Sequence, residues 1–297
     1  MKKIAIRVLI LNLLLIVSLS VYAQTEPRIY PPEYRNISNK VVVDSANIRI
    51  WYTLNAEKIF ANEANKCDDI QLLEIGSTIS KYYSHIVYQI DSTATDWREK
   101  NPKAKNEPTM ISNDGSIRPY WSDCFIDYSK NIFTEYACMP LAVRPNYIVE
   151  EDIPTQEWEI HNDTLTVFGY LCQKANCRFR GRDYIAWFTM DIPIQQGPWK
   201  FGGLPGLILK IYDVETKFVF ECINIENHNK KYPIFKYYDY RNYEKADRNK
   251  LLKLQNNIYN NYLKTAGFTP GNPNMDMNKF AKRTYKSPYN TFLLELE

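Results

Sequence analysis

The chain has 297 residues, with 37 basic and 34 acidic side chains and a formal charge of +3. Three of the bases lie in residues 1–23, which contain no acid, so the rest of the chain is neutral. A neutral chain lacks the excess of Lys and Arg that neutralises phosphates, and nucleic acid is therefore not an expected partner. Apolar residues at 45% and charged residues at 24% exclude wholesale disorder.

Residues 1–23 have the pattern of a secretory signal peptide. A positive start is followed by the apolar run Val8–Val21, and the small residue Ala23 precedes Gln24. The run is shorter than the roughly 20 apolar residues of a membrane-spanning helix. We therefore expect cleavage after Ala23 and export of 24–297 as a single β-rich domain, periplasmic or associated with the outer membrane.

The elements that follow are read from hydrophobic periodicity and from turn residues. The expected strands are Val41–Leu54, most of Ile70–Tyr88, a hairpin within Tyr120–Ala137, and then Leu165–Phe179, Asp183–Thr189, Leu207–Asp213 and Phe218–Ile225. Ala56–Asn65 and Tyr243–Ala266 have helical patterns. Asp91–Ser116 is expected to be a polar surface loop and Tyr147–Ile160 an acidic connector.

These elements predict an α+β fold that is mainly antiparallel β. We expect a curved open sheet or half-barrel with a few helices. Its central segment would be 163–226, followed by a C-terminal helix and tail over 243–297.

Glycine gathers in the central segment, where six of the ten glycines lie between Gly169 and Gly206. The order Leu-Pro-Gly-Leu at positions 204–207 predicts a type II turn with a positive φ at Gly206. Trp199 and Phe201 would share one face of an extended segment. The segment is either an aromatic rim that closes on a ligand or partner, or a strand–turn–strand corner in which glycine relieves crowding. The candidate rim residues are Arg180, Arg182, Trp187, Trp199, Phe201, Gly202, Gly203, Leu204, Pro205 and Gly206.

Arg178, Arg180 and Arg182 recur at every second residue, which places them on one face if the strand continues. Such a row could hold an anionic group through bidentate contacts. Alternatively, it is a solvated face that pairs with acids of neighbouring strands. The acids considered for this pairing are Asp183, Asp191 and Asp213.

Six cysteines in an exported chain permit disulfides. A hairpin centred near Asn131 would place Cys124 opposite Cys138 and allow a bond between them. Cys172 and Cys177 would point to opposite faces of a strand. We expect them to be buried thiols or to bridge other strands, with no metal site and no cofactor.

Catalytic signatures are absent from the sequence, which has no nucleophile elbow, zinc-protease helix or phosphate-binding loop. Its three histidines, His85, His161 and His228, are far apart along the chain. A non-enzymatic protein is therefore expected. An unrecognised hydrolase or thiol-redox enzyme that uses Cys172 or Cys177 with one histidine remains an alternative.

Four ordered segments of the sequence resemble the GLPGLI family of exported Bacteroidetes proteins. They are 168–175, 179–182, 186–189 and 197–209, the last reading Gly-Pro-Trp-Lys-Phe-Gly-Gly-Leu-Pro-Gly-Leu-Ile-Leu. The resemblance implies a signal-bearing envelope protein of uncharacterised function and offers no catalytic residues to carry over. By analogy of architecture alone, a curved sheet with a helix lid resembles the lipoprotein-carrier (LolA-like) open barrels.

The leading hypothesis is a non-enzymatic binding protein of the cell envelope that holds a lipid or other amphiphile or docks an outer-membrane protein. Trp187, Trp199, Phe201 and Leu204 would line the mouth of a half-open sheet, and the arginines at 180 and 182 would meet a negative head group. An alternative is a structural accessory to an outer-membrane transporter, in which the same rim is a protein interface.

Overall fold

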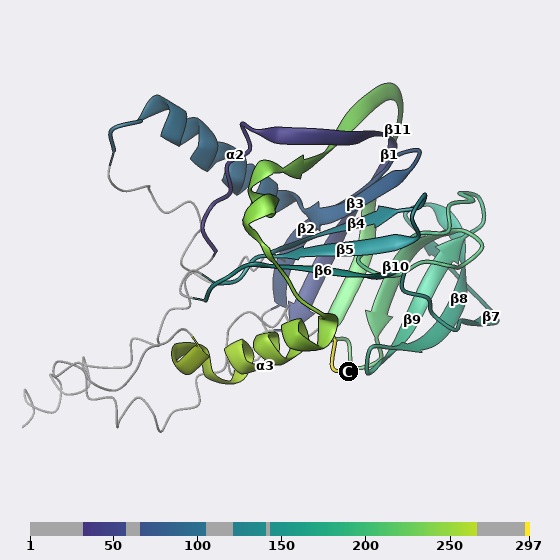
Figure 1. The fold of residues 1–297 in the computed structure, drawn as a ribbon. Helices are drawn as coiled ribbons and strands as arrows, with labels where there is room; N and C mark the ends of the chain where they lie inside the picture. The colour runs from purple at the N-terminus through teal and green to yellow at the C-terminus, as the bar shows by residue number, and fades with distance from the viewer. Residues whose placement is uncertain (1–31, 58–65, 105–120, 141–142, 266–294) are drawn as a thin grey trace, which may run out of the picture. The chain divides into compact units, whose positions relative to one another are not determined.

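The computed structural model describes residues 32–57, 66–104, 121–140, 143–265 and 295–297 (Figure 1). The predicted signal peptide therefore lies outside the described residues. The strands are β1 (Lys40–Glu57), β2 (Lys66–Ile75), β3 (Ile79–Ser84), β4 (Ser122–Asp127), β5 (Ile132–Ala137), β6 (Tyr147–Asp152), β7 (Glu159–Val167), β8 (Tyr170–Phe179), β9 (Arg182–Thr189), β10 (Leu207–Asp213), β11 (Phe218–Tyr237) and β12 (Glu244–Lys245). The helices are α2 (His85–Lys100), α3 (Arg248–Thr265) and the 3₁₀ helix η1 (Tyr238–Asn242). Among the described helices, none has both the length and the apolar character needed to cross a membrane.

The twelve described strands form one sheet in the order β12-β6-β5-β4-β3-β2-β1-β11-β10-β9-β8-β7. Every pair is antiparallel except β12–β6, which is parallel. Two meanders thus flank β1: β2 to β6 runs outward on one side, and β7 to β11 returns toward β1 from the opposite edge. The predicted fold, mainly antiparallel β with few helices, is confirmed as an open sheet with two α-helices in the described part. The likeness to lipoprotein carriers remains a prediction.

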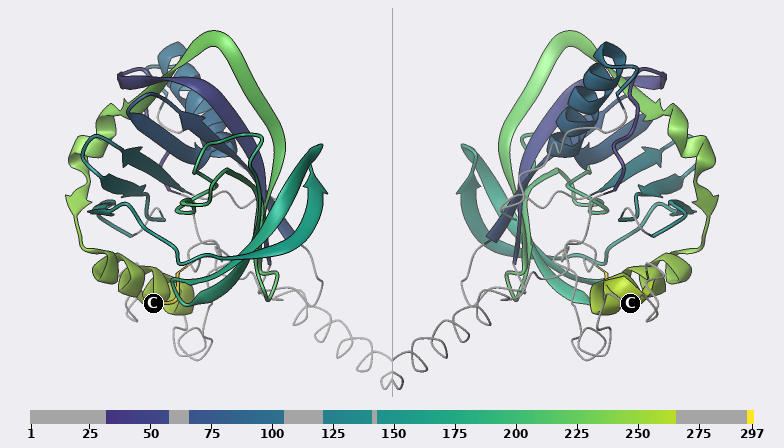
Figure 2. Two further views of the ribbon diagram at one scale, coloured as in Figure 1. Left: turned by 90° about the vertical axis from the view of Figure 1, so that its right-hand side faces the viewer. Right: turned by 90° about the vertical axis from the view of Figure 1, so that its left-hand side faces the viewer.

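The connection between β6 and β7 requires the sheet to curl. It joins Asp152 to Glu159, so it can span at most about 25 Å. The two strands lie ten positions apart in the sheet order, which in a flat sheet would separate them by roughly 48 Å. The sheet must therefore bend until these strands approach each other, as both views of Figure 2 show.

The two long strands β1 and β11 bend with the sheet. Their pairing has register shifts between Val42 and Asp44 and between Ala46 and Ile48, and such bulges bend strands. The first half of β1, the second half of β11 and η1 pack on the outer face of β4 and β5. This outer cluster consists of Ala46, Phe125, Tyr136, Ile234, Phe235, Tyr237 and Tyr240.

The inner face of the sheet carries the main core. Alternation along the strands places Cys124 and Phe133 on this face, while Phe125 and Tyr136 lie in the outer cluster. The main core draws residues from β1 to β5, from β7 to β11 and from the segment between β9 and β10.

The predicted hairpin of β4 and β5 is confirmed, but the predicted disulfide is wrong. Ser122 pairs with Ala137 and Cys124 with Glu135, so the register differs by three residues from the one that would bring Cys124 opposite Cys138. This odd offset places the two side chains on opposite faces, in separate clusters. No disulfide joins the cysteines whose side chains the structure describes.

Three element predictions were wrong in instructive ways. The segment from 91, predicted as a polar loop, begins inside α2. The sequence does not reveal this helix, because its buried side includes Asp91 in place of an apolar residue. The acidic connector contains β6, whose burial alternates at Tyr147 and Val149. The strand expected over Leu165–Phe179 is divided by a turn at Phe168 and Gly169. The predicted helix at 56–65 falls mostly outside the described residues, and its first two residues belong to β1.

Candidate functional site

The motif segment between β9 and β10, residues 190–206, packs along the inner face of the curled sheet. It folds back on itself through Gly203 N to Gln195 O at 3.1 Å and Ile208 N to Gln196 O at 3.0 Å. Trp199, Phe201 and Leu204 are buried in the main core. The ring of Phe201 meets aromatic rings of β8, β9 and β11, namely Phe179, Tyr184 and Phe220, as well as Trp199.

Two glycines of the motif are required for different reasons. A Cβ at Gly206 would overlap the carbonyl oxygen of Thr189, so this position admits no side chain. The positive φ expected at Gly206 is found at Gly203 instead, with φ +80°, and the predicted type II turn is therefore wrong. The glycine at 206 serves close packing of backbone on backbone.

The connector between β6 and β7 fastens the motif segment. The Gln156 side-chain amide donates to Lys200 O at 3.1 Å and accepts from Gly202 N at 3.1 Å. The Trp158 indole donates to Gly202 O at 2.8 Å. The chain that crosses between the two meanders is thus bonded to the segment that fills the space between them.

The candidate rim residues therefore lie in a packed interior. Trp199, Phe201 and Leu204 lie together as core side chains and not on an exposed lip. Trp187 is half-buried at the margin of the same core cluster. Of the two interpretations of this segment, the geometry favours the corner in which glycine relieves crowding.

Lys200 forms the centre of a buried charge cluster. It is 1% exposed, and its Nζ lies 3.2 Å from Glu135 Oε2, 3.2 Å from Glu151 Oε1 and 2.5 Å from Glu295 Oε1. Burial alone would lower the pKa of Lys200, but these three carboxylates raise it above its usual value. Glu135 and Glu151 lie on β5 and β6 and Lys200 on the motif segment, so the cluster links the two meanders.

The arginine row is divided among separate acids. Arg180 Nη2 lies 2.7 Å from Glu151 Oε2, and Arg182 Nη1 lies 3.2 Å from Asp213 Oδ2. Arg178 pairs with Asp183 at 3.4 Å on the exposed face. The strand does not continue through Gly181, because Arg180 and Gly181 form the turn between β8 and β9. Pairing with acids is observed, with Glu151 as a partner that the sequence did not indicate, but Arg180 and Arg182 are largely buried and do not form a solvated face.

The thiols of β8 are poorly suited to nucleophilic chemistry. Burial, together with the nearby Asp183, raises the pKa of Cys177 to about 12. Burial likewise raises the pKa of Cys172 to about 11. A nucleophilic cysteine needs a lowered pKa, so these shifts run against the thiol-enzyme alternative. In the described part of the chain, no group of three or more His, Cys, Asp or Glu could hold a metal ion.

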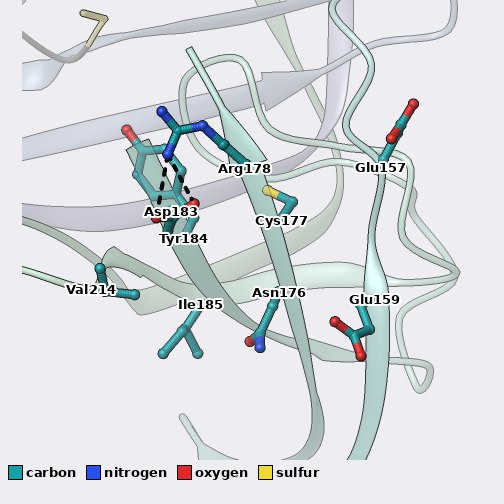
Figure 3. A pocket seen from close by; sticks show the side chains of 9 residues that line it. All are labelled: Glu157, Glu159, Asn176, Cys177, Arg178, Asp183, Tyr184, Ile185 and Val214. Atoms are coloured by element: carbon teal, nitrogen blue, oxygen red, sulfur yellow. Dashed lines mark hydrogen bonds and ion pairs between the residues drawn. The ribbon is translucent and has the colours of Figure 1, made fainter. Parts of the chain in front are cut away.

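A shallow pocket of about 370 Å³ lies at the start of β7, the end of β8 and the start of β9 (Figure 3). Its lining residues are Glu157, Glu159, Asn176, Cys177, Arg178, Asp183, Tyr184, Ile185 and Val214. Arg178 is turned toward Asp183, which leaves the two glutamates as an acidic wall. Negative charge disfavours a thiolate, so this pocket does not activate Cys177.

A second buried charge cluster lies beneath the outer cluster and was not anticipated from the sequence. Arg35 Nε lies 2.8 Å from Asp91 Oδ2, and Arg35 Nη1 lies 3.1 Å from Asp123 Oδ1. Lys81 Nζ lies 3.5 Å from Asp123 Oδ2 and donates to Phe235 O at 3.1 Å. The four charged residues come from the chain before β1, from β3, from α2 and from β4, and no local pattern in the sequence links them. The contacts of this cluster join the segment before β1 to α2 and β4, and join β3 to β4 and β11.

An apolar surface group lies at the end of the β7–β8 hairpin. Phe168 is 46% exposed, Leu171 is 64% exposed and Met190 is 62% exposed. Gln173 pairs with Phe188, and continuing this register by two residues places Leu171 opposite Met190. We call these three residues the hairpin-end group.

The fold and the motif segment define a mainly antiparallel β protein whose β9–β10 segment carries the Gly-Leu-Pro-Gly-Leu-Ile motif. Residues 180–210 match the family model described as "Protein of unknown function (Porph_ging)". This family corresponds to the GLPGLI family, and the resemblance expected from the sequence is confirmed over these residues.

Among curated proteins no match was found. Two crystal forms of PNGF-II, in space groups P21 and C2, are similar at 18% identity with TM-scores of 0.41 and 0.40. Each match covers 70% of this chain and 32% of the other, so this chain spans about a third of the length of those chains. Likeness at these TM-scores supports no inference about function.

Proposed function

We propose that this protein is an exported, non-enzymatic interaction protein of the cell envelope that binds a partner protein through the edge strand β7 and the hairpin-end group. The observation that carries the proposal is the exposure of Phe168, Leu171 and Met190 on a fold whose inner face is filled by its own motif segment. Clustered exposed apolar side chains mark interaction surfaces.

The backbone at Phe168 supports this assignment. Phe168 has φ +49° and Gly169 φ +81°, so the two residues form the turn between β7 and β8. Asn, Asp and Gly are favoured at the first position of such a turn, and a bulky side chain there costs about 1–2 kcal/mol. Strained positions concentrate at functional sites, and this one presents an aromatic ring to solvent.

Strand β7 provides the complementary backbone groups. It is the last strand of the sheet, so in the described part of the chain one of its edges carries no neighbouring strand. Ile160 and Leu165 on this strand are also exposed, at 46% and 40%. Addition of a partner's strand to such an edge supplies main-chain hydrogen bonds, and flanking apolar side chains supply contact area.

The filled interior bears on the choice of partner. An amphiphile held between Trp199, Phe201 and Leu204 would have to displace core side chains that are at most 4% exposed. A protein partner at the sheet edge needs no such rearrangement. The proposed place of action, periplasmic or at the outer membrane, rests on the signal-like pattern of residues 1–23.

Photo-crosslinking in intact cells tests the proposal. A photoreactive amino acid placed at Leu171 should give a discrete crosslinked protein band, whereas the same residue at Val214, which is 54% exposed on the β10–β11 turn, should give none. Leu171→Glu should abolish the band obtained from a probe at Met190 without lowering the thermal midpoint. A probe at Leu171 that gives only the bands seen from Val214 would refute the proposed interface.

A further inference from the structure

Residues 295–297 lie against the turn between β8 and β9, beside the start of α3 (Figures 1 and 2). Leu296 N donates to Arg180 O at 3.0 Å. A Cβ built at Gly181 would stand 2.8 Å from Leu296 Cβ and 3.1 Å from Glu297 Cγ, so the glycine allows this approach. One backbone hydrogen bond and this close approach thus join the segment to the turn.

The charges of this site are balanced only when Glu295 is present. Three cations converge there, namely Arg180, Lys200 and Arg248. The sheet supplies two of the carboxylates, Glu135 and Glu151, and Glu295 supplies the third. Without Glu295 these groups would retain an excess positive charge around the buried Lys200, which is unfavourable in a medium of low dielectric.

Glu295 is held through both of its carboxylate oxygens. Oε1 accepts from Lys200 Nζ at 2.5 Å, and Oε2 accepts from Arg248 Nη1 at 2.8 Å. Burial alone would raise the pKa of Glu295, but Lys200 and Arg248 lower it below its usual value. Arg178 Nη2 lies 3.1 Å from Glu297 Oε1, so the second glutamate of the segment also faces a cation.

Few of these contacts are apolar. Leu296 is 48% exposed, so the segment buries little hydrophobic surface and is held mainly by charge-assisted hydrogen bonds. Such contacts recognise a pattern of two carboxylates separated by one residue and need no particular side chain between them.

We propose that the β8–β9 turn, Lys200 and Arg248 form a binding site for acidic peptides of the pattern Glu-x-Glu, in which x is any residue, and that residues 295–297 occupy it in cis as a displaceable ligand. The site is distinct from the hairpin-end group, and its ligand class does not depend on the function proposed for that group. Since the ligand is part of the same chain, it competes with any added peptide at an effective concentration on the order of millimolar.

Peptide binding to the full exported chain tests the proposal. The probe is a fluorescein-labelled peptide Leu-Leu-Glu-Leu-Glu, which has the sequence of residues 293–297. The wild-type chain should bind it weakly, and Glu295→Gln, which weakens the resident ligand, should bind it at least tenfold more tightly. A peptide with Gln in place of its first Glu should lose at least tenfold in affinity for the variant. The matched control is Glu157→Gln, on the acidic pocket, which should behave as wild type.

The outcomes separate clearly. Equal binding of the probe to the wild type and to Glu295→Gln, or no binding to either, would overturn the proposal. The proposal is also overturned if the peptide with Gln binds Glu295→Gln with the same affinity as the probe. A chain that ends at residue 294, and so lacks residues 295–297, provides the second variant, and it should also bind the probe. If both variants fail to fold, as judged by circular dichroism, the segment is an integral part of the fold and not a displaceable ligand, which also overturns the proposal.

Discussion

Lys200 Nζ lies 3.2 Å from Glu135 Oε2, and this ion pair ties the motif segment to β5 across the inside of the curled sheet. The two residues are 65 positions apart in the sequence, and they belong to opposite meanders. Their contact explains why a lysine stands among aromatic and glycine residues in the motif. The lysine neutralises carboxylates that the sheet presents to the interior.

Lys200→Met should therefore destabilise the fold strongly. Removing the cation leaves Glu135 and Glu151 facing the interior without it, and breaking a buried ion pair costs about 3–5 kcal/mol. Urea denaturation followed by tryptophan fluorescence measures the free energy of unfolding. Lys210→Met is the matched control, because Lys210 pairs with Glu221 at 2.8 Å near the surface, and its loss should cost less than about 1 kcal/mol. Equal losses for the two variants would contradict the structural role of Lys200.

Gly206→Ala should destabilise the fold by roughly 3 kcal/mol or more, since the new methyl group would overlap the Thr189 carbonyl and force the two backbones apart. Gly169→Ala is the comparison, because no atom lies within 4 Å of a Cβ there and only the positive φ is unfavourable. That substitution should cost about 1–2 kcal/mol. Thermal or urea unfolding of both variants checks the order, and a larger loss for Gly169→Ala would show that close packing is not what position 206 requires.

The sequence predicted the elements whose patterns are local. The strand Leu207–Asp213 has the bounds expected from its apolar run, and α3 follows the periodicity of Leu251, Leu254 and Ile258. The helix α2 escaped prediction because its buried face includes Asp91, which is satisfied by Arg35 from a distant segment. A polar residue paired over 56 positions leaves no trace in local hydrophobic periodicity.

The sequence indicates which residues make up the motif segment, but it does not indicate that their side chains are buried. Glycine and aromatic density identifies residues 199–206, of which Trp199, Phe201 and Leu204 pack together in the main core. Their burial follows from the curl of the sheet, which depends on the order of all twelve strands and on the short connector after β6. The hairpin-end group is not predicted, because hydrophobic periodicity indicates a single strand over Leu165–Phe179. Phe168-Gly169 was the available signal, since glycine at the second position suits a two-residue turn.

Asp44 should contribute to stability in a pH-dependent way. Its carboxylate accepts from Thr78 N at 2.8 Å and Ile79 N at 2.9 Å, and it thereby fixes the turn between β2 and β3. Partial burial would raise the pKa of Asp44, but these backbone donors lower it well below its usual value. A lowered native pKa means that the stabilisation is complete above the unfolded value of about 4 and is lost as the pH falls through the native value.

Asp44→Asn should accordingly be less stable than the wild type at pH 7, and the difference should shrink as the pH falls below about 4. Urea denaturation at a series of pH values from 7 to 2 measures both chains. Asp163→Asn, an exposed substitution on β7, should follow the wild type throughout. A difference between wild type and Asp44→Asn that stays constant or grows on acidification would contradict the assigned role of the carboxylate.

The buried thiols should be slow to react in the folded protein. The pKa is about 11 for Cys138 and Cys172 and about 12 for Cys177 and Cys222, raised in each case first by burial. At pH 8 such thiols are ionised at a level of only about 10⁻³ to 10⁻⁴, compared with roughly a quarter for an unfolded cysteine. Alkylation by iodoacetamide should therefore be at least 100-fold slower in the native chain than in guanidinium chloride.

Peptide mapping by mass spectrometry resolves these four sites and Cys124 in a Cys67→Ser background, which removes a cysteine whose side chain lies outside the described residues. Adding Leu171→Cys to this background supplies an exposed thiol on the same strand as Cys172 and Cys177, and it should react at the rate of the unfolded chain. Rapid native alkylation of Cys172 or Cys177 would instead indicate an activated nucleophile. That result would revive the thiol-enzyme alternative against the interaction function proposed above, because an accessible thiolate on β8 has no role in binding at the sheet edge.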